Sequence, residues 1–171
     1  CLTGAQVEAV RKMWMGPRDA TGQLLYPGLE RGGEAGPGGW VRWVTGATPG
    51  SGSHAGLGLP FMKYVVYEDP TWDFRKFRYM RVNGLESDVD YVDDKVGRIF
   101  DSIDPDLSAF RARGGKLLQY HGFSDPDVPP ANSINYYESV VRAIGGSRNN
   151  ARALEETKEF YRLFMIPGMQ H

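Results

Sequence analysis

The stretch that decides the fold runs from Lys116 to Asp125 and reads KLLQYHGFSD. Its mostly apolar start predicts a short strand over residues 116–120, and the polar residues that follow predict a turn at the carboxyl end of this strand. Further along the chain, apolar residues at helical spacing predict a helix over residues 132–144, and the apolar run 160–166 predicts a second strand. A strand–helix–strand unit makes the two strands parallel, with a right-handed crossover. The sequence therefore predicts an α/β fold built on parallel strands and a crossover helix.

A carboxylate and an imidazole follow the two predicted strands. Asp125 ends the turn after the first strand, and His171 ends the turn PGMQH after the second. Parallel strands end at the same edge of a sheet, where open α/β folds place their chemistry, and such a pair can fix the tautomer of the histidine and stabilise its charged form. Taken singly, an exposed histidine and a turn-capping aspartate are the more common interpretation. Their matched placement favours a catalytic pair.

The serine nucleophile that would complete a triad is not found. In α/β-hydrolases the order along the chain is Ser, Asp, His, and the serine lies in a Gly-x-Ser-x-Gly elbow. Ser53, Ser124 and Ser147 each lack at least one of the two glycines. We expect the nucleophile upstream of residue 1, because both chain ends look cut: a capping box formed by Thr3 and Gln6 begins a helix almost at once. These 171 residues alone are expected to be inactive.

The spacing of apolar residues is less regular toward the amino terminus. Apolar spacing predicts helices over residues 4–15 and about 88–100. Residues 16–60 hold more than half of the 22 glycines and predict loop-rich structure. The apolar run 59–67 is ambiguous between helix and strand, and the polar stretch 147–159 is interpreted as an exposed insertion.

Composition and charge exclude several classes of partner. The 20 Lys and Arg residues nearly balance the 21 Asp and Glu residues, whereas a protein that binds nucleic acid normally carries a basic excess. No apolar run reaches the roughly 18 residues that a membrane span needs. The acidic group Asp88, Asp90, Asp93 and Asp94 is spread around a helix by its spacing, so we interpret it as a solvated face and not as a metal site.

Several blocks spread over nearly the whole chain resemble the tannase and feruloyl esterase family. They are CLTGAQV (residues 1–7), YPGLE (26–30), DLSAFRARGGKLLQYHGFSD (106–125), the pair Pro129-Pro130 with YYE (136–138), and FYRLFMIPGMQH (160–171). The resemblance implies an α/β-hydrolase core interrupted by a large lid. Residues 1–103 would be the C-terminal part of that lid, and residues 104–171 the last strands of the core.

The same resemblance implies an activity and two site residues. It implies a serine carboxylic ester hydrolase that acts on esters of aromatic acids, such as gallate or ferulate esters, through an acyl-enzyme. Asp125 corresponds to the acid of the triad and His171 to its base. The missing N-terminal part of the same protein would supply the serine.

The resemblance also changes how the single cysteine is interpreted. A lone cysteine by itself indicates a reducing compartment. Cys1 nevertheless resembles one half of a lid disulfide whose partner lies upstream, and a further disulfide cysteine would follow His171, which favours a secreted or periplasmic enzyme. The family's structural calcium is implied in the missing part of the lid, so we assign no metal ligand or cofactor to these residues.

Aromatic residues offer walls for a substrate pocket, because pockets for aromatic acids combine apolar walls with a few polar anchors. Trp40, Trp43 and Phe61 of the lid segment are the candidates, together with Phe123 beside the acid; core packing is the alternative for each. His121 is interpreted as structural, holding its loop by hydrogen bonds. The rival to an enzyme is a non-catalytic module that binds a phenolic ligand or a partner and whose hydrolase remnant is only structural.

Overall fold

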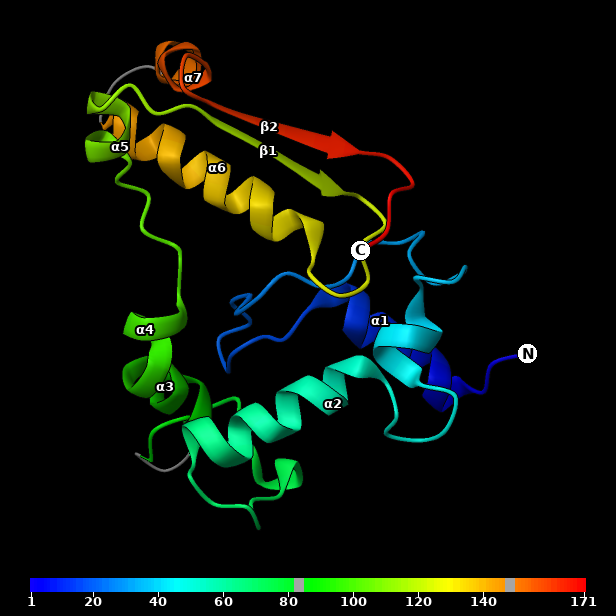
Figure 1. Cartoon of the computed structure of the whole chain (residues 1–171). Coiled ribbons are helices and arrows are strands. Elements are labelled where there is room, and N and C mark those ends of the chain that lie inside the picture. Colours follow the sequence, from blue (N-terminus) through cyan, green and yellow to red (C-terminus); the bar gives the residue numbers. More distant parts are fainter. Residues whose placement is uncertain (82–84, 147–149) are drawn as a thin grey trace.

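A two-stranded parallel sheet organises the second half of the molecule. The computed structural model describes residues 1–81, 85–146 and 150–171. Strand β1 (Leu117–Gly122) pairs with β2 (Tyr161–Ile166) from one end to the other, with Leu117 opposite Tyr161 and Gly122 opposite Ile166. Figure 1 shows both strands running in the same direction toward the C-terminus of the chain. The expected parallel pair is confirmed.

Two helices connect the strands. Helix α6 (Pro130–Gly145) lies along one face of the sheet, and α7 (Asn150–Lys158) follows it at the amino end of β2 (Figure 1). The centre of this unit is formed by Val140 of α6 with Phe160 and Tyr161, all of them buried. Burial of such side chains stabilises the fold by about 1.5–3 kcal/mol each.

The polar stretch before β2 is not an exposed insertion as expected. Ala153 and Thr157 of α7 are buried, and the Thr157 hydroxyl donates to the carbonyl of Ala153 over 2.7 Å. These two small side chains lie one turn apart on the same side of α7 and form a narrow buried face. A helix that is otherwise rich in charged residues can therefore still pack against the rest of the unit. The first part of the predicted insertion, residues 147–149, lies outside the described residues.

The other face of the sheet is open. Leu118 and Tyr120 of β1 and Phe164 of β2 point away from α6 and are exposed, because successive strand residues alternate between the two faces. Helix α5 (Ser108–Ala112) leads into β1.

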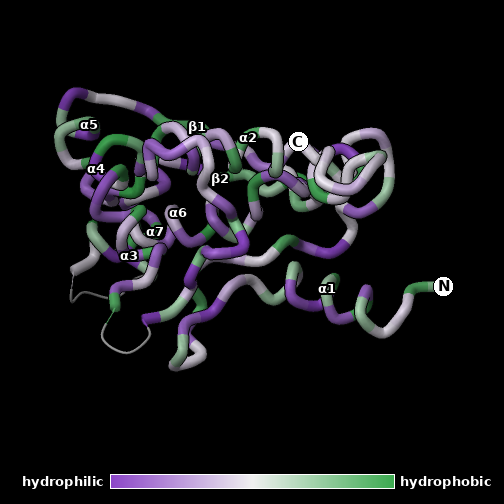
Figure 2. The backbone as a smooth tube through the Cα atoms, turned by 90° about the horizontal axis from the view of Figure 1, so that it is seen from below, coloured by the Kyte–Doolittle hydropathy of each residue, from purple (hydrophilic) through white to green (hydrophobic). Residues whose placement is uncertain are grey.

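The first half of the chain is made of short helices joined by long loops. Helix α1 (Gly4–Met15) begins at the predicted capping box, in which Thr3 and Gln6 each cap the backbone of the other. None of its residues is buried, and Figure 2 shows α1 apart from the sheet. The remaining helices of this half are η1 (Val41–Thr45), α2 (Ser53–Pro60), η2 (Phe61–Val66), η3 (Phe74–Lys76), α3 (Asp88–Val92), η4 (Asp93–Gly97) and α4 (Arg98–Phe100).

Two expectations for this half are settled by the structure. The ambiguous run 59–67 is helical, since η2 continues α2 without a break past Pro60. The predicted helix over residues 88–100 is present as α3, η4 and α4 in direct succession. No helix in the described part of the chain is both long and apolar enough to span a membrane, and Figure 2 shows short hydrophobic stretches alternating with hydrophilic ones.

The interpretation of the acidic helix as a solvated face is wrong for Asp88. Its carboxylate is buried and accepts hydrogen bonds from the Tyr67 hydroxyl (2.9 Å) and from the backbone N–H of Arg78 (2.6 Å), with the Arg78 guanidinium at 3.3 Å. Asp93 and Asp94 are exposed as expected. Asp88 faces inward because it is the first residue of α3, where the loop carrying Arg78 folds over it.

Candidate active site

The loops that follow the two strands are bonded to each other. The backbone N–H of Phe123 donates to the carbonyl of Ile166 (2.9 Å), and that of Ser124 donates to the carbonyl of Met169 (3.0 Å). Gly122 makes this approach possible, because a Cβ at this position would overlap the carbonyl oxygen of Met169. The β-strand pairing therefore continues into the loops that carry the acid and the imidazole.

Asp125 and His171 are brought together as the sequence predicts. Oδ2 of Asp125 lies 3.1 Å from Nδ1 of His171, while Oδ1 accepts from the backbone N–H groups of Asp127 (2.8 Å) and Val128 (3.1 Å). The carboxylate is almost fully buried, whereas the His171 side chain is 45% exposed. The geometry leaves the acid fixed and the imidazole accessible.

The environment keeps Asp125 ionised. Burial by itself raises the pKa of its carboxyl, but the two backbone hydrogen bonds and the contact with His171 outweigh this and hold the pKa below its ordinary value. An ionised Asp125 accepts a hydrogen bond from Nδ1 of His171, so Nε2 is the nitrogen left to accept a proton.

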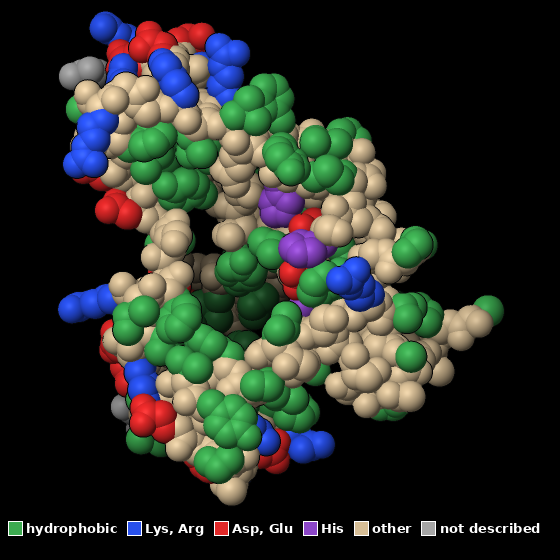
Figure 3. Space-filling model, in the orientation of Figure 1, with side chains coloured by type: hydrophobic (Ala, Val, Ile, Leu, Met, Phe, Trp, Pro, Cys, Tyr) green, Lys and Arg blue, Asp and Glu red, His purple; other side chains and the backbone are tan. Residues whose placement is uncertain are grey.

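All three histidines of the chain gather at two aspartates. Besides His171, Nε2 of His54 lies 2.9 Å from Oδ1 of Asp127, and Nε2 of His171 lies 3.6 Å from the other oxygen of Asp127. Figure 3 shows histidine side chains next to acidic ones at the middle of one face, beside a hollow with hydrophobic walls. The sequence patterns did not point to His54 or Asp127. The spacing of Asp127 from Asp125 was a usable signal, whereas nothing local marks His54.

His121 has the structural role expected of it. Its Nδ1 lies 2.7 Å from Oγ of Ser133 on α6, and its Nε2 lies 3.2 Å from Oδ2 of Asp125. These bonds tie the acid's loop to the helix behind the sheet, which confirms that His121 holds the loop.

One of the four candidate pocket aromatics contacts this centre. The ring of Trp43 meets that of His171 edge to face, with centroids 4.7 Å apart. Trp40 is buried near Trp14, with ring centroids 6.4 Å apart. Among the described residues, the indole N–H groups of Trp40 and Trp43 are buried without a hydrogen-bond partner. Trp43 is thus the candidate from the first half of the chain that the fold places against the imidazole.

The other two candidates differ in their surroundings. Phe61 packs edge-on against Phe100 at 5.2 Å, within the helical part of the first half. Phe123 is 38% exposed next to the acid's loop. Their role in binding stays a prediction.

A hollow of about 880 Å³ borders the histidine cluster. His54 and Asp127 form part of its wall, and its other walls are mostly apolar. They include Met13, Pro17, Tyr26, Pro27, Leu29, Val44, Tyr79, Met80 and Pro129. Its size suits an aromatic molecule, since ligand pockets commonly span about 300–1,000 Å³.

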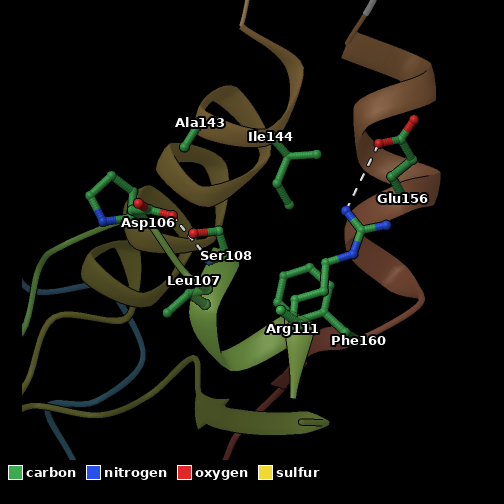
Figure 4. Close-up of a pocket in the computed structure, with 10 residues that line it drawn as sticks. Asp106, Leu107, Ser108, Arg111, Ala143, Ile144, Glu156 and Phe160 are labelled. Atoms are coloured by element: carbon green, nitrogen blue, oxygen red, sulfur yellow. Dashed lines mark hydrogen bonds and ion pairs between the residues drawn. The ribbon is translucent and has the colours of Figure 1, made fainter. Parts of the chain in front are cut away.

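A second hollow, of about 920 Å³, lies at the opposite end of the strands. Figure 4 shows Arg111 of α5 reaching across Phe160 toward Glu156 of α7, with Asp106 and Ile144 on the other side. The ion pair is long, at 4.0 Å. Because this hollow lies at the amino ends of β1 and β2, it is remote from Asp125 and His171.

No metal centre or disulfide accompanies the site in the described residues. Within residues 1–81, 85–146 and 150–171, no group of three or more His, Cys, Asp or Glu side chains could hold a metal ion. Cys1 is exposed and has a free thiol. Among these residues, the side-chain hydrogen bond of His171 goes to Asp125, and no serine hydroxyl hydrogen-bonds to its imidazole.

Comparison with known proteins points in one direction. A family profile described as tannase and feruloyl esterase matches residues 1–171. An uncharacterized esterase of Xanthomonas campestris pv. campestris is 39% identical over all of this chain and 31% of its own length. Feruloyl esterase B of Aspergillus niger is 34% identical over all of this chain and 29% of its own. The chain thus spans about a third of the length of these relatives.

Solved structures agree with the sequence relatives. The crystal structure of an esterase from Aspergillus oryzae superposes with a TM-score of 0.73 at 33% identity, covering 100% of this chain and 30% of the other. Feruloyl esterase B from Aspergillus oryzae gives a TM-score of 0.74 at 28% identity over the same shares. The mixed helical structure with a small parallel sheet is therefore the arrangement found within these larger esterases.

Proposed function

The chain belongs to the tannase and feruloyl esterase family, and from this premise we propose that its protein is a serine hydrolase of carboxylic esters of aromatic acids, such as gallate or ferulate esters. Asp125 is the proposed triad acid and His171 the proposed base. The observation that carries the proposal is the 3.1 Å contact between Oδ2 of Asp125 and Nδ1 of His171 at the paired strand ends. The nucleophilic serine is proposed to come from a part of the protein outside these residues.

In the proposed reaction, His171 takes the proton of the serine as the serine attacks the ester carbonyl. The buried Asp125 carboxylate stabilises the imidazolium that forms, and His171 then gives the proton to the leaving alcohol. Water activated by His171 next hydrolyses the acyl-enzyme. Backbone donors outside these residues would stabilise the oxyanion, each by about 3–4 kcal/mol.

The two halves of the chain take different parts in this proposal. Residues 104–171 are proposed as the last strands of an α/β-hydrolase core, because β1, α6 and β2 place the acid and the base at one sheet edge. Residues 1–103 are proposed as the C-terminal part of a lid. In support, the first half reaches the site through Trp43, through His54 and through the hydrogen bond from Gln170 to the carbonyl of Ala35 (2.6 Å).

The hollow beside His54 and Asp127 is proposed to receive the aromatic acid. Its apolar walls fit a ring, and Asp127 with His54 can meet a phenolic hydroxyl. Val44→Trp, which fills the hollow next to Trp43, is expected to raise KM for an aryl-acid ester at least tenfold and to leave turnover of an acetyl ester near the wild-type value. Equal loss on both esters would contradict this assignment.

The decisive experiment measures hydrolysis of an aryl-acid ester by the full-length protein. His171→Ala and Asp125→Asn are expected to lower kcat by about 10³-fold or more without changing the fold. Asp106→Asn at the remote hollow is the matched control and should behave as wild type. Full activity of His171→Ala would overturn the proposal, and tight binding of a phenolic acid without any turnover by the wild type would favour the non-catalytic module instead.

Four further expectations are proposals. We propose a secreted or periplasmic protein in which Cys1 forms a disulfide with a cysteine outside these residues, detectable by mass spectrometry of the non-reduced protein. The calcium ion that the family resemblance implies would bind elsewhere in the lid, and no proposed step uses it. The 171-residue chain alone is expected to lack esterase activity.

A further inference from the structure

One oxygen of Asp125 is shared between two histidines. Oδ2 lies 3.1 Å from Nδ1 of His171 and 3.2 Å from Nε2 of His121, while Oδ1 is occupied by two backbone N–H groups. A carboxylate only accepts hydrogen bonds, so both imidazole nitrogens that face Oδ2 carry a proton. His121 is therefore a second donor to the oxygen that orients His171.

The opposite nitrogen of His121 is fixed by a relay of side chains. Nδ1 of His121 lies 2.7 Å from Oγ of Ser133, and that hydroxyl accepts from Nε2 of Gln119 over 2.9 Å. Oε1 of Gln119 in turn accepts from the hydroxyl of Tyr161. Since Oγ of Ser133 already accepts from Gln119, its single hydroxyl hydrogen is available for donation to an unprotonated Nδ1 of His121. This arrangement suits an imidazole of His121 that carries its proton at Nε2.

Regular elements hold this relay in place. Gln119 and His121 lie on the face of β1 that packs on α6, where Ser133 is located. Tyr161 at the start of β2 is fully buried, and this burial, with Tyr136 and Tyr137 nearby, raises its pKa to about 12, so its hydroxyl remains a donor. A satisfied chain of hydrogen bonds in a low-dielectric setting is stiff. The relay thus fixes the tautomer of His121 from the interior of the sheet–helix layer.

We propose that His121 is a positioning residue of the triad: locked as a neutral imidazole by Ser133, it holds Oδ2 of Asp125 and competes with His171 for that oxygen. The inference rests on the proposed function, because it takes Asp125 and His171 as acid and base. A second donor on Oδ2 draws charge away from the contact with His171. Removal of that donor is therefore expected to strengthen the contact between Oδ2 and Nδ1 of His171.

The charged and titratable neighbours of the two imidazoles are few. His171 faces Asp125 and Asp127, and His54 stands behind Asp127. His121 faces Asp125 within the described residues, besides the neutral Ser133. A change at His121 therefore reaches His171 through Asp125.

The first test compares two substitutions of His121 in the full-length enzyme. His121→Leu removes the donor, and the acidic limb of kcat/KM against pH is expected to move up by about one pKa unit, a tenfold change in the protonation equilibrium. His121→Gln keeps an N–H group near the position of Nε2 and should leave the limb close to wild type. A uniform loss at every pH in His121→Leu, with the limb unmoved, would reduce His121 to a packing residue.

The second test keeps the imidazole of His121 and removes its hydrogen bond with Ser133. Ser133→Ala leaves Nδ1 of His121 without its partner. The acidic limb of kcat/KM against pH should therefore move up, as in His121→Leu, but by a smaller amount. Ser139→Ala is the matched control: it removes a hydroxyl from the same helix whose 2.7 Å bond goes to the carbonyl of Tyr136 and not to the relay. Equal behaviour of the two serine variants would contradict the relay.

The third readout does not depend on activity. In full-length protein with ¹⁵N-labelled histidine, the His121 signals are those missing from His121→Gln, and at neutral pH they should report a protonated Nε2 and an unprotonated Nδ1. A charged imidazole or the opposite tautomer would overturn the assignment whatever the kinetics. Full activity in His171→Ala would instead refute the proposed function and leave this readout standing.

Discussion

Two buried aspartates in this molecule both accept backbone hydrogen bonds but have different side-chain partners. Asp125 follows β1 and Asp88 starts α3, and both are nearly inaccessible, with 5% and 9% exposure. Asp125 accepts from two backbone N–H groups and Asp88 from one. Burial alone raises the pKa of each carboxyl, but hydrogen bonds hold it below its ordinary value. Asp125 then meets two histidines, whereas Asp88 meets Arg78 and Tyr67.

The difference lies in what the partners can do with a proton. The guanidinium of Arg78 stays charged at every accessible pH, and burial with Asp88 beside it raises the pKa of Tyr67 far above its ordinary range. That cluster can only hold its loop to α3. Imidazoles exchange protons near neutral pH, so the Asp125 cluster can serve acid–base chemistry. A buried carboxylate alone does not mark an active site; its partners do.

The largest difference between the two clusters is expected when each aspartate is replaced in turn by a neutral residue. Asp125→Asn is expected to lower kcat by about 10⁴-fold, because an amide no longer favours the imidazolium. Asp88→Asn should leave kcat of the folded enzyme close to wild type. The measurement is kcat for an aryl-acid ester normalised to the folded fraction, and comparable losses in both variants would erase the distinction.

A substitution at Gly122 tests whether the close approach of the two strand-end loops positions the Asp125 cluster. Gly122→Ala places a Cβ against the carbonyl of Met169, so the two strand-end loops must separate, at a cost of about 1–3 kcal/mol in the free energy of unfolding. We also expect kcat to fall, because His171 follows Met169 closely. Gly56→Ala on α2, where a Cβ meets open space, is the control and should be neutral or mildly stabilising. Denaturant unfolding and kcat, measured together, check both expectations.

Asp88→Ala should act on stability alone. It leaves Arg78 and the Tyr67 hydroxyl without their acceptor, at a cost of about 2 kcal/mol in the free energy of unfolding. Asp93→Ala on the exposed side of the same helical run is expected to change it by at most about 0.5 kcal/mol. If the two variants unfolded at the same denaturant concentration, the Asp88 cluster would have no structural role.

The smallest expected effect is a dependence of the protein's stability on pH, to which both aspartates contribute. A group whose pKa is lower in the folded than in the unfolded protein stabilises the fold fully above its unfolded value, near 3.9, and loses that contribution as the pH falls through its folded value. Asp125 and Asp88 both follow this sign. The denaturation midpoint should therefore fall between pH 6 and pH 3, and it should fall less in Asp88→Asn. An unchanged pH dependence in that variant would contradict the sign of its shift.

Local patterns predicted what depends on local physics. The strands, the crossover helix and the capped first helix follow from apolar periodicity and end signals, and the meeting of Asp125 with His171 follows from the rule that parallel strands end at one edge. The polar character of two segments led to wrong predictions, at Asp88 and at α7. A single inward-facing residue or a narrow buried face does not change the overall polar pattern of such a segment.

The sequence by itself determined the β–α–β unit and the placement of its acid and imidazole, since backbone hydrogen bonding and side-chain alternation are fixed by neighbouring residues. Only the tertiary structure decided that His54 reaches Asp127, that Trp43 meets the ring of His171, and that a relay from Tyr161 locks His121. His54 and Asp127 are separated by 73 residues of chain. The chain between them includes several helices and β1, and local periodicity does not determine how these elements pack together. The packing of the whole chain therefore sets these contacts.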